Sequence, residues 1–119
     1  MRDFKKFTFW YDALQLSADI CVITRKFPIE ERFGLANQLR RAAISIVSNI
    51  AEGSGRNSDM DFVHFLDMAL GSSYEVEAQL YISERLRYIT ADEMKVLLNN
   101  LFSVQRRISG FIKNIRGIQ

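Results

Sequence analysis

The sequence of 119 residues lacks the cysteine pairs of disulfide-rich proteins and zinc ribbons, and it lacks the long apolar run of a membrane-spanning helix. Its one cysteine, Cys21, has no second cysteine for an intramolecular disulfide or a Cys-x-x-Cys metal pair, which excludes small disulfide-rich proteins and zinc ribbons. No apolar run approaches the roughly 18 residues of a membrane span, and no basic segment precedes a signal-like apolar stretch. We therefore expect a cytoplasmic protein without membrane contact.

Residues that favour disorder are also scarce, since the chain has one proline and six glycines. Hydrophobic residues make up 48% and charged residues 25%, which is the composition of a packed globular protein. The length is close to the commonest size of a single domain. We predict one domain over residues 1–119.

The net charge of +2 is unevenly distributed along the chain. Residues 59–84 carry six acidic and no basic side chains, whereas residues 85–119 carry seven basic and two acidic ones. Two interpretations remain open. The segments of opposite charge attract each other within the fold or across an interface, or the basic segment binds an anionic partner.

Apolar residues recur at helical spacing in four segments, at about 8–27, 33–51, 58–87 and from 90 onward. Ser58 and the Thr90/Glu93 capping box predict two helix starts, and Gly53 and Gly55 are expected to end the second helix in the left-handed conformation. Gly71 and the serines after it predict a close approach of another helix. The short connections favour an all-α fold, an antiparallel up-down four-helix bundle.

The sequence offers no convincing catalytic or metal site. His64 is the only histidine, and it lies one helical turn after Asp61, which is the spacing of a di-iron element. A di-iron site needs two such elements and two further carboxylates, and the helical periodicity predicts that His64 points outward. We therefore expect no enzyme activity, no metal or other cofactor and no small-molecule substrate.

Two surface patterns are more informative. A strip of small polar residues between ionic ends runs along the second helix, and it is interpreted either as a solvated face or as a subunit contact or polar channel. Tyrosines recur every seven residues on the third helix, beside Glu77 and Glu84, which would repel phosphate; a protein contact is therefore favoured over base stacking. The strip comprises Asn37, Arg41, Ser45, Ser48 and Glu52, and the predicted subunit interface comprises Trp10, Tyr74, Tyr81 and Tyr88.

Two blocks of sequence resemble the four-helix-bundle family of 23S rRNA intervening-sequence proteins. The first runs from Phe27-Pro28 through Gln38–Ile46 to Asn49–Gly53 and Arg56, and the second contains Gly71-Ser72, Glu75 and Gln79-Leu80. The resemblance implies a homopentamer. A related branch, the accessory variability determinant of diversity-generating retroelements, assists a reverse transcriptase and binds nucleic acid. The signature positions are Arg40, Arg41, Asn49, Glu52, Gly53 and Glu75, which suit an architectural role as readily as a functional one.

We therefore predict a non-enzymatic homo-oligomer that binds RNA, or a ribonucleoprotein or reverse-transcriptase partner, through a basic surface. Helix one is apolar on two stripes, which is more apolar surface than one bundle buries. Arg106, Arg107 and Lys113 are expected to project into solvent from the fourth helix, on the side away from Leu101, Val104 and Ile108. The alternative is a protein-interaction scaffold without nucleic-acid binding. The predicted phosphate contacts are Arg40, Arg41, Arg56, Arg106, Arg107, Lys113 and Arg116.

Overall fold

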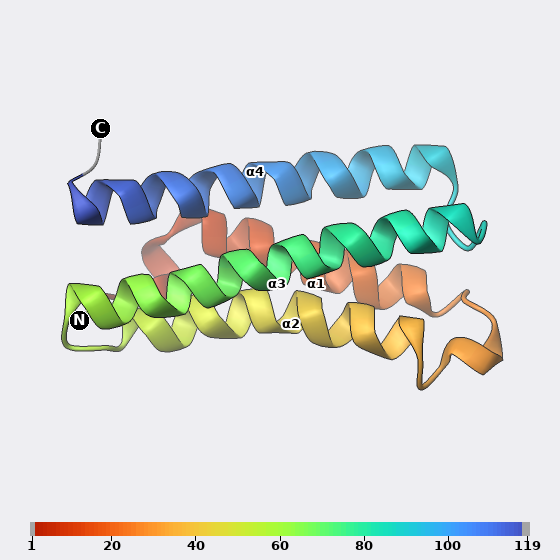
Figure 1. Cartoon of the computed structure of the whole chain (residues 1–119), viewed down its shortest axis with the longest axis horizontal. Helices are drawn as coiled ribbons and strands as arrows, with labels where there is room; N and C mark the ends of the chain where they lie inside the picture. Colours follow the sequence, from red (N-terminus) through yellow and green to blue (C-terminus); the bar gives the residue numbers. More distant parts are fainter. Residues whose placement is uncertain (1, 118–119) are drawn as a thin grey trace.

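The computed structural model describes residues 2–117 and shows four helices joined by short connections (Figure 1). Two 3-10 turns, at Phe4–Lys6 and Ile29–Glu31, precede the first and second helices, and the described residues contain no strand. The predicted all-α fold is confirmed. The helices are α1 (Thr8–Thr24), α2 (Leu35–Ser54), α3 (Asp59–Arg85) and α4 (Ala91–Arg116).

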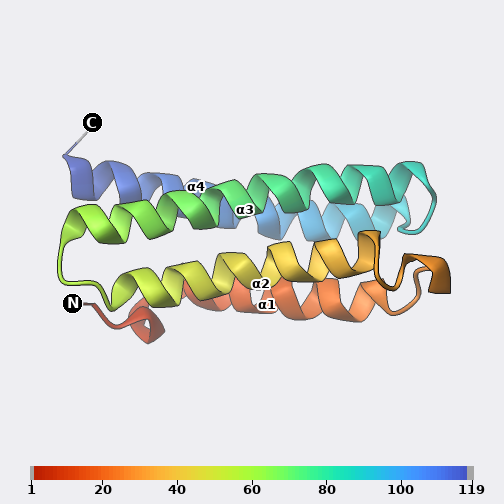
Figure 2. The same cartoon turned by 60° about the horizontal axis from the view of Figure 1, so that its bottom comes forward.

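The helices form an up-down bundle in which each one packs against two neighbours (Figure 2). α1 contacts α2 and α4, and α3 contacts the same two helices, so α1 and α3 are diagonal to each other, as are α2 and α4. The connection between α2 and α3 lies at the same end as both ends of the chain, whereas the other two connections lie at the opposite end (Figure 1). None of the helices in residues 2–117 is long and apolar enough to cross a membrane.

The contact between α2 and α3 is the most extensive, and small residues make it possible. A Cβ atom added to Gly53 would lie 2.5 Å from the Cβ of Phe65, so the two backbones approach more closely than any larger residue permits. The Oγ atoms of Ser45 and Ser72 are 2.8 Å apart. The prediction for Gly71 is wrong, since this glycine is exposed and a Cβ added to it would meet nothing within 4 Å.

Each helix contributes one buried stripe to the core, at the spacing that the sequence predicts. The Oγ of Ser58 accepts a hydrogen bond from the N–H of Asp61 at 3.1 Å and caps α3. Thr90 and Glu93 form the predicted capping box of α4. The fully buried side chains include Leu16, Ile20, Leu39, Ile46, Ile50, Phe62, Leu66, Leu80, Leu101 and Ile108.

Candidate nucleic-acid interface

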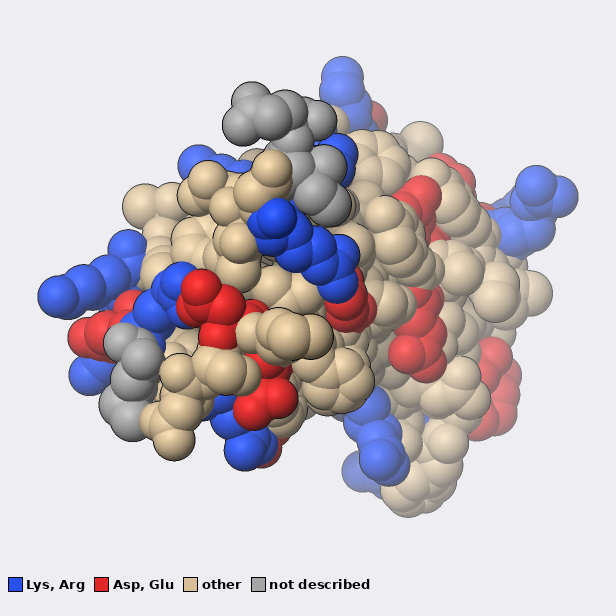
Figure 3. Space-filling view, turned by 60° about the vertical axis from the view of Figure 1, so that its left-hand side comes forward, with Lys and Arg blue, Asp and Glu red and all other residues tan. Residues whose placement is uncertain are grey.

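The seven predicted phosphate contacts do not share one surface, and three of them form ion pairs within the chain. Arg107 pairs with Asp12 of α1, Arg116 pairs with Asp67 of α3 at 3.1 Å, and Arg56 pairs with Glu52 at 3.3 Å. At the end of the bundle that holds the chain termini, basic and acidic side chains are interspersed (Figure 3). Of these three ion pairs, only Arg116–Asp67 joins the basic segment 85–119 to the acidic segment 59–84, so attraction between the two segments accounts for one of them.

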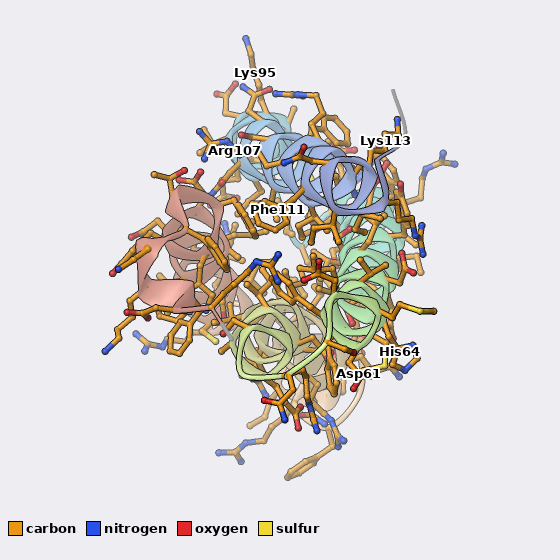
Figure 4. All side chains as sticks on the ribbon, turned by 90° about the vertical axis from the view of Figure 1, so that its left-hand side faces the viewer. Asp61, His64, Lys95, Arg107, Phe111 and Lys113 are labelled. Carbon is orange, nitrogen blue, oxygen red and sulfur yellow. The ribbon has the colours of Figure 1, made fainter. Side chains whose placement is uncertain are left out.

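Arg106, Arg107 and Lys113 are all exposed, as expected, but they do not share one side of α4. Arg107 points toward α1, where its guanidinium also donates to Thr8 Oγ1 at 3.4 Å, whereas Lys113 lies on the other side of α4 (Figure 4). Successive residues on a helix are rotated by about 100°, so adjacent arginines diverge and residues seven apart lie on one face. Arg106 and Lys113 are therefore the basic residues that share a surface.

Arg106 and Lys113 line a groove between α3 and α4 that has a volume of about 450 Å³. Within residues 2–117 neither of them forms an ion pair, and both are exposed. Ser109 lies between them on the same face, and Gly110 leaves that wall open, because a Cβ added to it would meet nothing within 4 Å. The residues that line this α3–α4 groove are Tyr74, Gln105, Arg106, Ser109, Gly110 and Lys113.

Two of the predicted tyrosines lie on the α3 side of this surface. Tyr74 lines the groove and is 54% exposed, and Tyr81, two turns further along α3, is 46% exposed. The hydroxyl of Tyr81 donates a hydrogen bond to Glu77 Oε2 at 3.2 Å. Loss of hydration, this hydrogen bond and the negative charge of Glu77 together raise the pKa of Tyr81.

Glu77, which was expected to repel phosphate, is already engaged by neighbouring donors. Its Oε1 accepts a hydrogen bond from Gln105 Nε2 at 3.0 Å, and its Oε2 accepts the one from Tyr81. Hydrogen bonds to both oxygens of a carboxylate stabilise its charge locally. Neutral donors fix the position of this carboxylate but leave its negative charge, so the expected repulsion of phosphate near Tyr81 remains.

The other two residues of the predicted subunit interface hold the protomer together. Trp10 is half-buried, and its Nε1 donates to the carbonyl oxygen of Val47 at 3.2 Å. The ring of Tyr88 packs against Phe27 with the ring centroids 5.2 Å apart, and its hydroxyl donates to Glu31 Oε2 at 3.0 Å. That hydrogen bond raises the pKa of Tyr88. The tyrosine stripe thus divides into two exposed members and one internal one.

The signature residues have mixed roles. Asn49 Nδ2 donates to Ser45 O at 2.8 Å, and Gly53 fits against Phe65, so these two are architectural. Arg41 and Glu75 are exposed and border a second groove, between α2 and α3, with a volume of about 300 Å³. Because Ser45 bonds to Ser72 of α3, the inner edge of the polar strip packs within the chain.

The structure brings no metal-binding cluster together in residues 2–117. His64 is exposed and points away from the bundle (Figure 4). No three His, Cys, Asp or Glu side chains of the described residues are placed to hold a metal ion. The sequence analysis missed the contribution of Ser109 and Gly110 to the groove, although their spacing from Arg106 and Lys113 on one helix face could have revealed it.

A short-linked four-helix bundle defines a class of small all-α proteins, and comparison with known proteins identifies the family within this class. The model of the 23S rRNA-intervening sequence protein family matches residues 5–110. The chain therefore belongs to this family, as its motifs indicated. No curated protein matches the chain.

A solved structure supports the same assignment. The fold is similar to the crystal structure of a protein of unknown function from the S23 ribosomal protein family of Bacteroides thetaiotaomicron, with a TM-score of 0.83 and 25% sequence identity. The similarity covers 89% of this chain and 99% of that protein. Neither comparison indicates an enzyme family.

Proposed function

We propose that this chain is a non-enzymatic cytoplasmic protein that binds single-stranded RNA in the α3–α4 groove. The observation that carries the proposal is the position of Arg106 and Lys113, two cations that form no ion pair within residues 2–117, beside the exposed ring of Tyr74. Cations hold phosphates and aromatic rings stack bases, and together they bind single strands with little sequence preference. The family name refers to a 23S rRNA intervening sequence, which makes RNA the first nucleic acid to test.

We propose further that the chain is a homo-oligomer, with a pentamer favoured by the family resemblance. The outer side of α1 carries Tyr11, Leu14 and Val22, and the neighbouring helix α2 carries Ile44; all four are exposed. We call these four residues the α1 apolar face. A monomer rarely exposes a row of large apolar side chains, and a second copy of the chain offers an uncharged surface to cover it. Oligomerisation would also increase the number of basic side chains that one assembly presents to an RNA, since each protomer contributes two.

The decisive experiment replaces both free cations and measures RNA affinity against salt. With a labelled single-stranded RNA, the log affinity of the wild-type protein should fall linearly with log salt, by about 0.7 per phosphate contact. The double variant Arg106→Gln/Lys113→Gln should bind more weakly and lose about 1.4 of that slope in each protomer that contacts the RNA. Helicity should not change, because both side chains are exposed.

Arg107→Gln is the matched control. It removes the same charge from the same helix, but this arginine pairs with Asp12 on the α1 side, so the salt slope should not change. If the wild-type protein does not bind RNA at low salt, the alternative of a protein-interaction scaffold is favoured. If the control weakens binding as much as the double variant, the α3–α4 groove is not the RNA site and the proposal fails on that point.

Stacking is tested separately from charge. Tyr74→Ala should weaken RNA binding by about 1–3 kcal/mol for the base that it stacks, with the salt slope unchanged because no charge is removed. Phe33→Ala is the control, since Phe33 is an exposed aromatic residue on the connection between α1 and α2, away from the groove. Equal losses in the two variants would exclude stacking on Tyr74.

A further inference from the structure

We infer that a second anion site, distinct from the α3–α4 groove, lies at the connection between α1 and α2 and binds a phosphate monoester. Three arginines line a hollow of about 380 Å³ there, and no acidic residue is among its lining residues. We call this site the arginine hollow. Its lining consists of Thr24, Arg25, Phe27, Pro28, Ile29, Arg32, Ala36 and Arg40.

The three guanidinium groups have no carboxylate partner. Within residues 2–117, Arg25, Arg32 and Arg40 form no ion pair. Arg40 is half-buried and donates only to neutral acceptors, Thr24 Oγ1 at 3.4 Å and Arg32 O at 3.5 Å. A partly buried charge without an opposite charge is costly, and an anion in the hollow would remove that cost.

Arg40 is held in position for such a ligand. Thr24 is 3% exposed, and its hydroxyl donates to Cys21 O at 3.1 Å, so the oxygen that accepts from Arg40 is fixed on α1. The neighbouring Glu31 forms no ion pair among the described residues; its Oε1 accepts from Leu35 N at 3.2 Å and its Oε2 accepts from the hydroxyl of Tyr88. Glu30 is exposed and forms no ion pair among the described residues.

The arginines are not needed to satisfy the C-terminal end of α1. Backbone N–H groups of residues 25–27 already donate to the last carbonyl oxygens of this helix, at 3.1 to 3.3 Å. On the other side of the hollow, Ala36 belongs to the first turn of α2, where the backbone N–H of Leu35 already donates to Glu31 Oε1, so the three arginines supply the positive charge of the hollow. The electrostatics of the hollow therefore point to a negatively charged ligand.

The shape of the lining specifies the class of anion. Guanidinium groups donate pairs of hydrogen bonds that match phosphate oxygens, and three of them balance a doubly charged phosphate monoester. The remaining wall is apolar, formed by Phe27, Pro28 and Ile29, and Ile29 is 80% exposed at the rim. Such a wall suits the organic part of a nucleotide, supplied either as a free nucleoside monophosphate or as the 5′-phosphorylated end of an RNA.

Calorimetric titration at low ionic strength tests the site with adenosine 5′-monophosphate, inorganic phosphate and adenosine. The monophosphate should bind, inorganic phosphate should bind more weakly, and adenosine should not saturate. Arg40→Gln should weaken binding of the monophosphate at least about tenfold, since it removes a charge-assisted contact. Arg32→Gln should also weaken it, and because this side chain is exposed, the variant decides the question if Arg40→Gln does not fold.

Arg85→Gln is the matched control, because Arg85 is an exposed arginine at the same end of the bundle and outside the hollow. A failure of the monophosphate to saturate at millimolar concentration, or an equal loss in Arg32→Gln and Arg85→Gln, would overturn the proposal. Displacement by 5′-phosphorylated but not 5′-hydroxyl RNA would assign the hollow to an RNA end, and displacement by nucleotides alone would assign it to a free nucleotide. The Arg106→Gln/Lys113→Gln variant should keep full affinity for the monophosphate, so the failure of either site is recognised separately.

Discussion

Gly53 and Gly71 lie on different sides of the bundle and should respond oppositely to the same substitution. An added Cβ at Gly53 would be 2.5 Å from the Cβ of Phe65 and would force α2 away from α3, so Gly53→Ala should destabilise the fold by about 1–3 kcal/mol. Gly71→Ala meets no neighbour and should stabilise α3 by about 0.5–1 kcal/mol. Urea unfolding of both variants measures the difference, and a stable Gly53→Ala protein would disprove the close approach.

At the same scale, Glu93 makes part of the stability depend on pH. The hydrogen bond from Lys26, with the one from the backbone of Thr90, lowers the pKa of Glu93 below its ordinary value of 4.5. The contribution is therefore present above that value and is lost as the pH falls through the lowered pKa. Lys26→Met should reduce stability near neutral pH by less than about 1 kcal/mol, because the pair is partly exposed, and the difference from the wild-type protein should vanish in acid. Urea unfolding over this pH range tests it.

Among the elements, the start of α3 depends on one hydroxyl. Ser58 accepts a hydrogen bond from the N–H of Asp61 and is itself exposed, so Ser58→Ala should cost about 1 kcal/mol through the cap alone. Asn57→Ala, one residue earlier and outside the cap, should leave the stability unchanged. Thermal unfolding distinguishes the two, and equal losses would contradict the capping role.

Helix starts were predicted better than helix ends. Thr90 and Glu93 form the predicted capping box. The predicted end of α2 is wrong, because the helix continues through Gly53 to Ser54, and Gly55 has φ −83° instead of the left-handed conformation. Caps follow from side chains three residues apart, which the sequence shows directly. The role of Gly53 depends on Phe65, twelve positions away on another helix, and this contact is not visible in the local pattern.

At the scale of the whole molecule, the oligomeric state of two variants shows whether the α1 apolar face or the exposed tyrosines of α3 form the subunit contact. Leu14→Glu places a charge in the α1 apolar face and should dissociate the oligomer in sedimentation velocity experiments. Tyr81→Glu places the same charge beside the α3–α4 groove, at a similarly exposed position, and should leave the oligomer intact while weakening RNA binding. The opposite result would place the subunit contact at the tyrosines of α3, as the sequence analysis predicted.

The sequence by itself determined the four helices, two of their caps, the antiparallel bundle and the family. These follow from periodicity, capping chemistry, short connections and contiguous motifs, all of which are local. Only the tertiary structure decided which charged side chains form ion pairs within the fold and which do not. Periodicity places Arg107 on a face of α4 but does not show that Asp12, ninety-five residues earlier, meets it there. The ion pairs, the α3–α4 groove and the arginine hollow depend on how each helix is rotated toward its neighbours, and that rotation is set by packing of the whole core.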